Sequence, residues 1–506
     1  MRAGSRGRAG VAPLAFLAVV LLDVPALVGA LLDGVLLSAD VTPTLWQTCG
    51  PAPGSAGPGA ACRPRNGQTG PVTDQTTSPV PAAARTHVDD LARFVTASPS
   101  SFHAAAEIAR RCVDAGFVRL DEADAWPTGP GRYVVVRDGA AVAWVVPDGA
   151  TPTTGVTVLG AHTDSPGFKL KPRPTTGRAG WWQAGVEVYG GPLLNSWLDR
   201  ELELAGRLVS TDGTEHLVRT GPMLRIPQLA VHLDRAVNDG LALDKQRHTQ
   251  PVWGLGELAG ADVVAALAAQ AGLEGSDVAG YDVVVADTQE PRTFGADAAL
   301  LASGRLDNLL STHAGLVALL DVADGAGVEL TTIPVLAAFD HEEIGSGSRS
   351  GAAGPFLEDV LARIGDALGA DAQDRHRALA ASLCVSSDVG HAVHPNYPER
   401  HDPANQPLAG GGPILKINAN QRYSTDAVGA ALWNRACTAA GVPSQEFVSN
   451  NTIPCGSTIG PITATRLGMR TVDVGVPILS MHSARELCAV LDPWFLTRAV
   501  RELFAR

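Results

Sequence analysis

Residues 339–346 constrain the fold of this chain more than any other segment, because they place two adjacent glutamates directly after a buried strand. The preceding residues, Ile333–Phe339, form an apolar run of strand length. Open α/β sheets carry their functional sites at the carboxyl ends of strands. Glu342 and Glu343 would leave an extended backbone in opposite directions. We therefore expect one of them to bind a metal and the other to handle protons.

Length and charge narrow the class of protein. A chain of 506 residues is long enough for two or three domains. Its 45% hydrophobic and 18% charged residues are ordinary for a globular protein. The net charge of −13, without any block of clustered Lys and Arg, argues against a nucleic-acid partner.

The seven cysteines are scattered and include no C-x-x-C pair. This spacing predicts neither a disulfide framework nor a zinc knuckle. We expect the cysteines after residue 100 to be buried free thiols. They are Cys112, Cys384, Cys437, Cys455 and Cys488.

Residues 1–85 read as an extension of the folded protein. Three arginines precede an apolar run at residues 11–22, and small residues follow near position 30, so segment 11–30 resembles a signal peptide. Asp23 and Asp33 interrupt the apolar residues, so no stable membrane span is expected. Residues 43–84 are rich in Pro, Gly, Ser and Thr, which indicates a linker or disorder. The alternatives are an exported or anchored protein, or a cytoplasmic one whose translation start is assigned too far upstream.

The remaining chain alternates helix and strand patterns, which predicts an α/β fold. Ordered structure is expected from near Thr86, with two amphipathic helices before a hairpin around Asp138 and Gly139. Short antiparallel strands, a helix at 261–271 and a strand at 282–286 suggest an inserted β-rich domain at residues 171–289. The catalytic domain would then comprise residues 86–170 and 290–506, around a mixed sheet.

A second polar motif ends the strand predicted at residues 156–160. His162 and Asp164 are two positions apart, so on a strand they would share one side. The Asp164 carboxylate could then hold the His162 imidazole in one tautomer, as the neighbours of metal ligands commonly do. Taken alone, the pair is more often structural than metal-binding.

Three further donors lie near the ends of predicted elements. Asp307 opens a helix, where a plain N-cap is the simpler interpretation. Asp388 follows a strand at 383–387, and His482 follows a strand at 470–474. Together with His162 and Glu343 these residues make two imidazoles and three carboxylates, a donor set suited to a pair of zinc ions, with manganese or cobalt as possible substitutes. One carboxylate would have to bridge the two ions.

At this point the sequence resembles a family, the aspartyl aminopeptidases. These enzymes are dinuclear zinc exopeptidases that remove an acidic residue from the N-terminus of a peptide. The resemblance runs from about Thr86 to Arg506. It rests on the motifs His162-Thr163-Asp164-Ser165-Pro166-Gly167, Arg305-Leu306-Asp307-Asn308, Asp340-His341-Glu342-Glu343-Ile344-Gly345-Ser346, Gly390-His391-Ala392-Val393-His394-Pro395-Asn396-Tyr397, Cys455-Gly456-Ser457-Thr458-Ile459-Gly460-Pro461 and Met481-His482-Ser483.

The resemblance implies a role for each residue of the site. His162 and Asp388 would bind one zinc ion, Glu343 and His482 the other, and Asp307 would bridge them. Asp164 would orient His162. Glu342 would be the general base that takes a proton from the attacking water and passes it to the leaving amine.

The resemblance also implies a way of binding substrate and of assembling. His391, Lys416 and Tyr423 match positions that contact substrate, and Lys416 suits an acidic side chain. His232, by itself a plain surface histidine, matches one that reaches into the active site of a neighbouring subunit. The inserted domain would build dimers, and these would assemble into a tetrahedral dodecamer.

Two alternatives remain open from the sequence. Related dinuclear zinc enzymes include deacylases and carboxypeptidases, and the spacing of the ligands alone does not separate them. A catalytically idle assembly protein is the alternative from another class. Glu342 and all five candidate ligands argue against it, because a scaffold has no physical reason to gather so much charge at one site.

Overall fold

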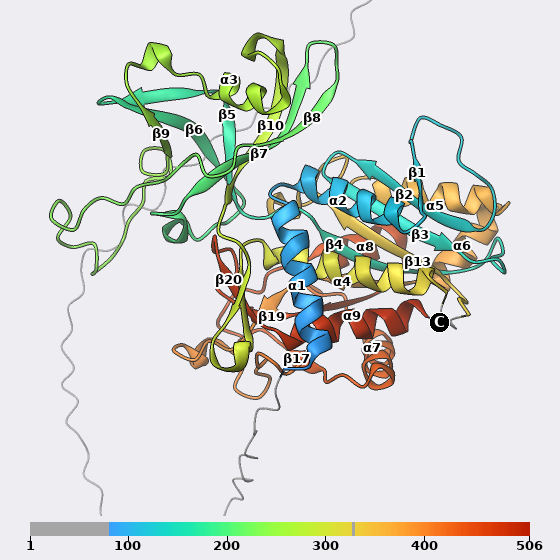
Figure 1. Ribbon diagram of the computed structural model, residues 1–506. Helices are drawn as coiled ribbons and strands as arrows, with labels where there is room; N and C mark the ends of the chain where they lie inside the picture. Colours follow the sequence, from blue (N-terminus) through green and yellow to red (C-terminus); the bar gives the residue numbers. More distant parts are fainter. Residues whose placement is uncertain (1–79, 326–328, 506) are drawn as a thin grey trace, which may run out of the picture. The chain divides into compact units, whose positions relative to one another are not determined.

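The computed structural model describes residues 80–325 and 329–505 (Figure 1). The expectations for the first 79 residues, including the signal-like segment 11–30, lie outside this range. None of the helices within the described range is long and apolar enough to cross a membrane.

Two helices open the described chain. Helix α1 spans Ala82–Ala97 and therefore begins upstream of the expected start near Thr86. Helix α2 spans Ser101–Asp114, and the side chain of Ser100 caps it by accepting a hydrogen bond from the backbone N–H of His103. The break predicted between the two amphipathic helices is confirmed.

A nine-stranded mixed sheet organises the catalytic region. Its spatial order is β1-β2-β3-β13-β4-β14-β18-β16-β17. The four central strands β13, β4, β14 and β18 are parallel to one another. The strands are β1 (Val118–Leu120), β2 (Gly131–Arg137), β3 (Ala140–Val146), β4 (Val156–His162), β13 (Ile333–Phe339), β14 (Leu383–Ser387), β16 (Ile414–Lys416), β17 (Gln445–Phe447) and β18 (Arg470–Gly475).

Helices cover both faces of this sheet. Helices α1, α2, α4 (Leu306–Ala323), α7 (Ala427–Ala440) and α9 (Leu491–Phe504) share one hydrophobic cluster with it. Helices α5 (Phe356–Ala367), α6 (Ala372–Ala380) and α8 (Ile459–Leu467) contribute to a second cluster on the other face. The central strands are thus shielded from water on both sides, as parallel strands usually are.

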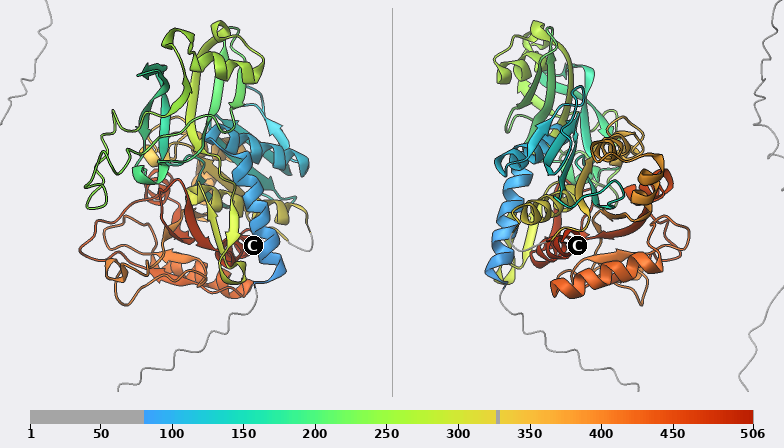
Figure 2. Two further views of the ribbon diagram at one scale, coloured as in Figure 1. Left: turned by 60° about the vertical axis from the view of Figure 1, so that its left-hand side comes forward. Right: turned by 90° about the vertical axis from the view of Figure 1, so that its right-hand side faces the viewer.

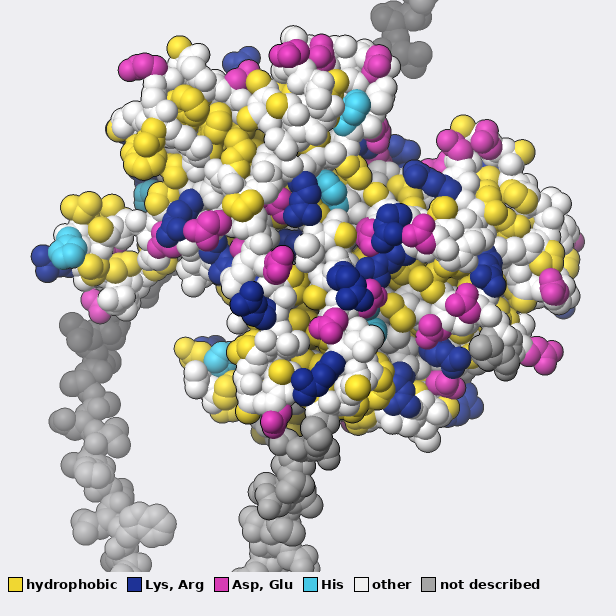
Figure 3. Space-filling model, viewed as in Figure 1, with side chains coloured by type: hydrophobic (Ala, Val, Ile, Leu, Met, Phe, Trp, Pro, Cys, Tyr) yellow, Lys and Arg dark blue, Asp and Glu magenta, His cyan; other side chains and the backbone are white. Residues whose placement is uncertain are grey.

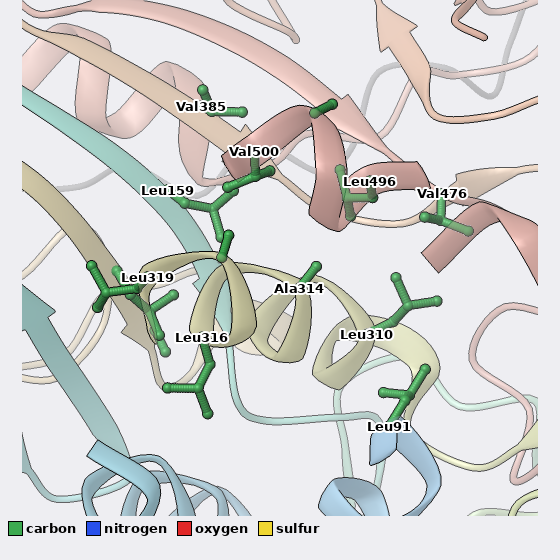
Figure 4. Close-up of a cluster of buried hydrophobic side chains, with 14 of the residues drawn as sticks. Leu91, Leu159, Leu310, Ala314, Leu316, Leu319, Val385, Val476, Leu496 and Val500 are labelled. Atoms are coloured by element: carbon green, nitrogen blue, oxygen red, sulfur yellow. The ribbon is translucent and has the colours of Figure 1, made fainter. Parts of the chain in front are cut away.

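Alternation along the strands divides their side chains between the two clusters. Val158 belongs to one cluster and Leu159 to the other, and Val335 and Leu336 on the neighbouring strand divide in the same way. Figure 4 shows Leu159 between α4 and Val500 of α9. Complete burial of such a leucine contributes roughly 1.5–3 kcal/mol to folding. This packing holds the strand ends, and the polar residues that follow them, in place.

A second sheet of six antiparallel strands is built from residues 167–287. Its spatial order is β8-β7-β10-β5-β6-β9. Figure 2 shows from two further sides that these strands, in green, group together. The strands are β5 (Gly167–Arg178), β6 (Trp181–Tyr189), β7 (Leu202–Ser210), β8 (Glu215–Arg219), β9 (Val252–Leu255) and β10 (Val278–Asp287).

The short antiparallel strands expected in this segment are confirmed, among them β7 and β8 on either side of Asp212 and Gly213. The helix expected at 261–271 is shorter: α3 spans Val263–Ala268, and a 3-10 turn follows that ends at Gly272 in a left-handed conformation. The boundaries 171–289 for an inserted domain, and its role in forming dimers, stay a prediction.

A third sheet of five short strands was not expected from the sequence. Its order is β11-β12-β20-β19-β15. The strands are β11 (Arg292–Phe294), β12 (Leu300–Ser303), β15 (Gly390–His391), β19 (Pro477–Leu479) and β20 (Glu486–Ala489). Strand β12 leads into α4, and β19 and β20 flank the turn that carries His482.

The free cysteines match the sequence expectation with one difference. Cys112, Cys384, Cys437 and Cys488 are buried thiols, but Cys455 is only half-buried. Cys455 lies beside a small cluster of Ile414, Tyr423 and Phe447, away from the two main clusters. The other two cysteines of the chain precede the described residues.

Candidate metal centre

The donors predicted from sequence meet at one edge of the nine-stranded sheet. His162 ends β4, the two glutamates follow β13, and Asp388 follows β14. These strands are parallel, so their carboxyl ends lie together. Asp307 comes from the first turn of α4, and His482 from the turn between β19 and β20.

Asp307 lies between the two histidines. Its Oδ1 is 3.2 Å from Nε2 of His162, and its Oδ2 is 3.4 Å from Nε2 of His482. The carboxylate faces these imidazoles and caps no helix, so the simpler N-cap interpretation is wrong. An aspartate with one oxygen turned to each histidine has the geometry of a bridging ligand.

Each half of the cluster contains one further carboxylate. Oδ1 of Asp388 is 3.7 Å from Nε2 of His162, and Oε2 of Glu343 is 3.5 Å from Nε2 of His482. Two groups that share Asp307 are thus compact enough for one ion each: His162, Asp307 and Asp388, and Asp307, Glu343 and His482. A third compact group joins His162 to Glu342 and Glu343.

From the sequence we expected the two adjacent glutamates on an extended backbone, but they do not lie on one. His341 adopts a left-handed conformation, and Glu342–Ile344 form a 3-10 turn. The reversal after β13 brings ligand oxygens of both glutamates within 4.8 Å of each other and of His162. The prediction that the two glutamate side chains point in opposite directions is therefore wrong, because strand β13 ends before the two glutamates begin.

The donor set fits a divalent metal. Asp307 is only 4% exposed, and its buried Oδ1 has no hydrogen-bond partner among the residues that the structure describes. A buried carboxylate oxygen without a donor is costly unless a cation faces it. Two imidazoles and three carboxylates are borderline-to-hard ligands of the kind that zinc takes in catalytic sites.

The electrostatics of the metal-free centre show the same need for positive charge. Burial lowers the pKa of His162, but the carboxyl groups of Asp164, Asp307 and Asp388 outweigh it and raise the pKa well above its ordinary value. Burial and the nearby charge of Asp307 raise the pKa of Glu343 well above its usual range. Burial is also the main cause that raises the pKa of Glu342 to about 7.

The carboxylate of Asp164 holds the turn of the two glutamates through the backbone N–H groups of that turn. Its Oδ1 accepts a hydrogen bond from the N–H of Glu342 at 3.0 Å, and its Oδ2 accepts one from the N–H of Glu343 at 3.1 Å. Nδ1 of His162 lies 3.4 Å from Oδ1 of Asp164, but its hydrogen bond, at 3.0 Å, is with the backbone carbonyl of the same residue. Asp164 therefore contacts both the histidine and the glutamate pair.

Comparison with known proteins decides the family. The model of a family described as aminopeptidase I zinc metalloprotease (M18) matches residues 94–504. A probable M18 family aminopeptidase 2 of Streptomyces avermitilis is 57% identical over 419 residues, which cover 82% of this chain and 97% of the relative. The chain belongs to the M18 family of aminopeptidases.

Solved structures of M18 enzymes share the fold. An M18 family aminopeptidase from Thermotoga maritima superposes with a TM-score of 0.74 at 26% identity, over 83% of this chain and 96% of that one. The mApe1 dodecamer of S. cerevisiae gives a TM-score of 0.73 at 27% identity, with the same coverage of each chain. The α/β fold with mixed sheets and the family-level resemblance to aspartyl aminopeptidases are confirmed.

Membership of the M18 family settles the class of reaction. The protein is a zinc metallopeptidase that acts as an aminopeptidase. A deacylase, a carboxypeptidase and a catalytically idle scaffold are therefore set aside.

The candidate metal centre is surrounded by strained backbone. Arg305, His341 and His482 all have a positive φ, of 58°, 63° and 66°. A left-handed conformation costs a residue with a side chain roughly 1–2 kcal/mol. Such strain persists only where surrounding contacts hold it, and it gathers at functional sites. Each of these residues lies within two positions of a candidate ligand or is one.

Two polar residues near the centre were missed from the sequence. Glu486 is 2% exposed and accepts hydrogen bonds from the backbone N–H groups of Asp307 and His482. Tyr189, at the end of β6, donates its hydroxyl to Asp164. Neither residue has a sequence signal, because each reaches the site only through the pairing of distant strands.

The candidate substrate residues lie in different surroundings. His391 and Tyr423 line a cavity of about 270 Å³ together with Asn450 and Met481, the residue before His482. Lys416 is buried, with its ammonium 3.9 Å from Oδ2 of Asp388 and donating to the carbonyl of Val389 at 2.9 Å. The same ammonium lies 5.4 Å from the ring centre of Tyr423.

His232 is not brought to the centre within this chain. It lies, exposed, on the long connection between β8 and β9. It is therefore separate from the cluster of candidate ligands and from the cavity that His391 and Tyr423 line.

Proposed function

We propose that this M18 aminopeptidase removes N-terminal aspartate and glutamate from peptides by means of two zinc ions and a glutamate base. The observation that carries the proposal is the position of Asp307, with one oxygen turned to His162 and the other to His482. Two compact donor groups that share one carboxylate are what a dinuclear site requires.

The five donors would hold the ions in two halves. His162 and Asp388 would hold one ion, Glu343 and His482 would hold the other, and Asp307 would contribute to both. Bound zinc would polarise the scissile carbonyl and acidify a water molecule near neutral pH. Manganese or cobalt could take the same donors, since both accept imidazole and carboxylate ligands.

Glu342 is the proposed general base. Its carboxylate lies within 4.8 Å of donor atoms of His162 and Glu343, close enough to exchange a proton with a water molecule beside these proposed ligands. In this role Glu342 takes a proton from the attacking water and then protonates the leaving amine. Asp164 holds the N–H of Glu342, so the base keeps its position while the proton moves.

Lys416 is the proposed source of preference for acidic residues. Its buried ammonium, between Asp388 and Tyr423, leaves a positive charge close to the cavity that His391 and Tyr423 line. A substrate carboxylate in this cavity would gain from that charge, because its attraction is screened less in a buried site than in water.

The test is hydrolysis of chromogenic substrates with N-terminal Asp, Glu, Leu or Ala by the full chain, with and without a chelator. We expect cleavage selective for Asp and Glu that the chelator abolishes. In Lys416→Met, acidic substrates should lose at least tenfold in kcat/KM relative to the neutral ones. Cleavage of neutral substrates alone would keep the metallopeptidase chemistry and overturn the acid preference.

We further propose that the active form is a homo-oligomer, as in the mApe1 dodecamer of S. cerevisiae. The connection between β8 and β9 exposes Leu229, Val231 and Leu233, of which Leu233 is 75% exposed. Figure 3 shows hydrophobic side chains on the lobe at the left, to which this connection belongs in Figure 1. Exposed apolar groups on one segment are typical of an assembly surface.

His232 sits among these apolar residues and is proposed to complete the active site of a neighbouring subunit. His232→Ala should lower activity at least tenfold without removing zinc. His248→Ala is the matched control, because His248 is also exposed on this connection and its Nδ1 accepts the N–H of nearby Asp244. Equal activity of both variants and the parent would remove the case for a shared site. Light scattering would report the assembly independently.

A further inference from the structure

A buried carboxylate outside the proposed ligand set joins two of the ligands through their backbones. Oε2 of Glu486 accepts the N–H of Asp307 at 3.0 Å, and Oε1 accepts the N–H of His482 at 2.8 Å. One residue therefore sets the distance between the first turn of α4 and the turn after β19.

Within residues 80–325 and 329–505 the carboxylate of Glu486 makes its hydrogen bonds with two backbone N–H groups and forms no direct ion pair. Arg305 and His482 act on its charge only from a longer distance. Hydrogen bonds from N–H groups to a buried carboxylate are stronger than those between neutral groups. Such a contact can hold a backbone that would otherwise relax.

The turn that carries His482 needs this support. Ser480 and His482 both have a positive φ, of 58° and 66°. The N–H of Leu193 donates to the carbonyl of His482 at 2.9 Å, and the carbonyl of Gly191 lies 3.0 Å from its Nδ1. Glu486 supplies a third contact to His482, at its backbone N–H.

The other half of the centre is held by different means. His162 is the last residue of β4 and pairs with Phe339 of β13 in the parallel ladder. The hydroxyl of Thr312 donates to the carbonyl of His162 at 2.9 Å. None of these contacts involves Glu486. Glu486 holds Asp307, which both halves share, but of the two histidines it holds only His482, so a change at Glu486 should affect the half with His482 more.

We propose that Glu486 is a positioning residue that sets the spacing of Asp307 and His482 and thereby the affinity for the ion that Glu343 and His482 share. The inference rests on the ligand assignment of the proposed function. It makes Glu486 the counterpart of Asp164, which holds the N–H groups of the two glutamates in the same way.

The test compares Glu486→Gln with Asp492→Asn in the full chain. Glutamine keeps the size of the side chain but turns an NH₂ group toward one of the two N–H donors. Asp492 is the matched control: it is also fully buried and also accepts two backbone N–H groups, from Gly410 at 2.7 Å and Gly412 at 2.9 Å, but it contacts no candidate ligand.

The measurement is the affinity of each zinc-binding step, determined by competition with a chromogenic chelator. The zinc content per chain is measured as well. In Glu486→Gln we expect one of the two binding steps to lose at least tenfold in affinity while the other stays within threefold. Asp492→Asn should keep both steps. Glu486→Asp, which retains the charge but is one methylene shorter, should show the same selective loss and serves if the glutamine variant does not fold.

Three results would overturn the proposal: unchanged binding in the Glu486 variants, an equal loss in both steps, or the same loss in Asp492→Asn. Failure of the ligand assignment would look different. The unmodified protein would then bind fewer than two zinc ions per chain, before any variant is compared, and Glu486 would have no second ion to position.

Discussion

The hydroxyl of Tyr189 donates a 2.9 Å hydrogen bond to Oδ2 of Asp164, and this contact joins the six-stranded sheet to the metal centre. The next residue, Gly190, has a φ of 65°, and a Cβ there would lie 3.2 Å from Cβ and from the carbonyl of Glu343. The end of β6 therefore passes directly against the glutamate turn. Residues of the candidate metal centre are thus in contact with a strand of the other sheet.

Tyr189→Phe should lower kcat/KM by about tenfold or more, because a hydrogen bond to a buried charged group contributes about 1.5–3 kcal/mol. Steady-state kinetics with the preferred substrate would measure the loss. Tyr281→Phe is the matched control, since Tyr281 belongs to the same sheet and donates at 2.7 Å to the carbonyl of Lys171. A similar loss in both variants would indicate general loosening of the sheet.

Glu342→Gln should reduce kcat by at least about 100-fold, the usual size of a general-base contribution, because the amide cannot accept the proton. Zinc content and melting temperature should stay close to those of the unmodified protein, since the five proposed ligands are intact. Metal analysis and kinetics on the same preparation would test both. Activity that survives with full zinc content would show that another group acts as the base.

Removal of the metal should destabilise the folded chain, because Asp307, Glu343 and Asp388 are then left close together with too little positive charge. A ligand at 100 times its Kd stabilises a protein by about 2.7 kcal/mol per site. Thermal unfolding should therefore occur at a lower temperature after chelation and recover with zinc. Magnesium, which prefers oxygen ligands, should not restore it. Equal melting temperatures with and without zinc would contradict a site of this affinity.

Acid should weaken the packing of α1 on α4 and α9. The ring of His87 lies 4.9 Å from that of His313, and its Nε2 lies 3.2 Å from the hydroxyl of Thr497. Burial and the neighbouring His313 lower the pKa of His87 to about 3. Below the ordinary histidine pKa of about 6.5, His87 binds a proton in the unfolded chain but not in the folded chain. The free energy of unfolding therefore decreases as the pH decreases.

His87→Gln should therefore lose less stability than the unmodified protein between pH 7 and pH 5, by up to about 2 kcal/mol. The difference in melting temperature between the two proteins at each pH measures this effect, because loss of zinc in acid affects both alike. His376→Gln, at an exposed position of α6, should follow the unmodified protein. Parallel curves for all three would show that His87 does not contribute to acid sensitivity.

The local sequence pattern was sufficient to predict a helix or strand wherever one segment buries its own apolar side chains. The run Ile333–Phe339 is a strand with the predicted bounds, and the hairpin around Asp138 and Gly139 also forms where it was expected. The candidate ligands could be recognised for the same reason. Four of the five come next to the end of such a predicted element, and a charged residue placed there has few structural uses.

Local pattern was insufficient where the conformation changes within one or two residues. The adjacent glutamates were expected on extended backbone, but β13 ends at Phe339 and a left-handed His341 turns both carboxylates toward His162. Asp307 resembles an N-cap in the sequence, and only the approach of His162 and His482 from other elements shows it between two imidazoles.

The sequence by itself determined the α/β class, the family and the set of donors, because apolar period and residue type are properties of single segments. Tertiary structure alone decided how those donors are spaced and what holds them. Glu486 and Tyr189 act on Asp307, His482 and Asp164 across separate sheets. Hydrogen bonds of this kind depend on distances between strands that are far apart in the chain, and those distances are set only when the sheets pack.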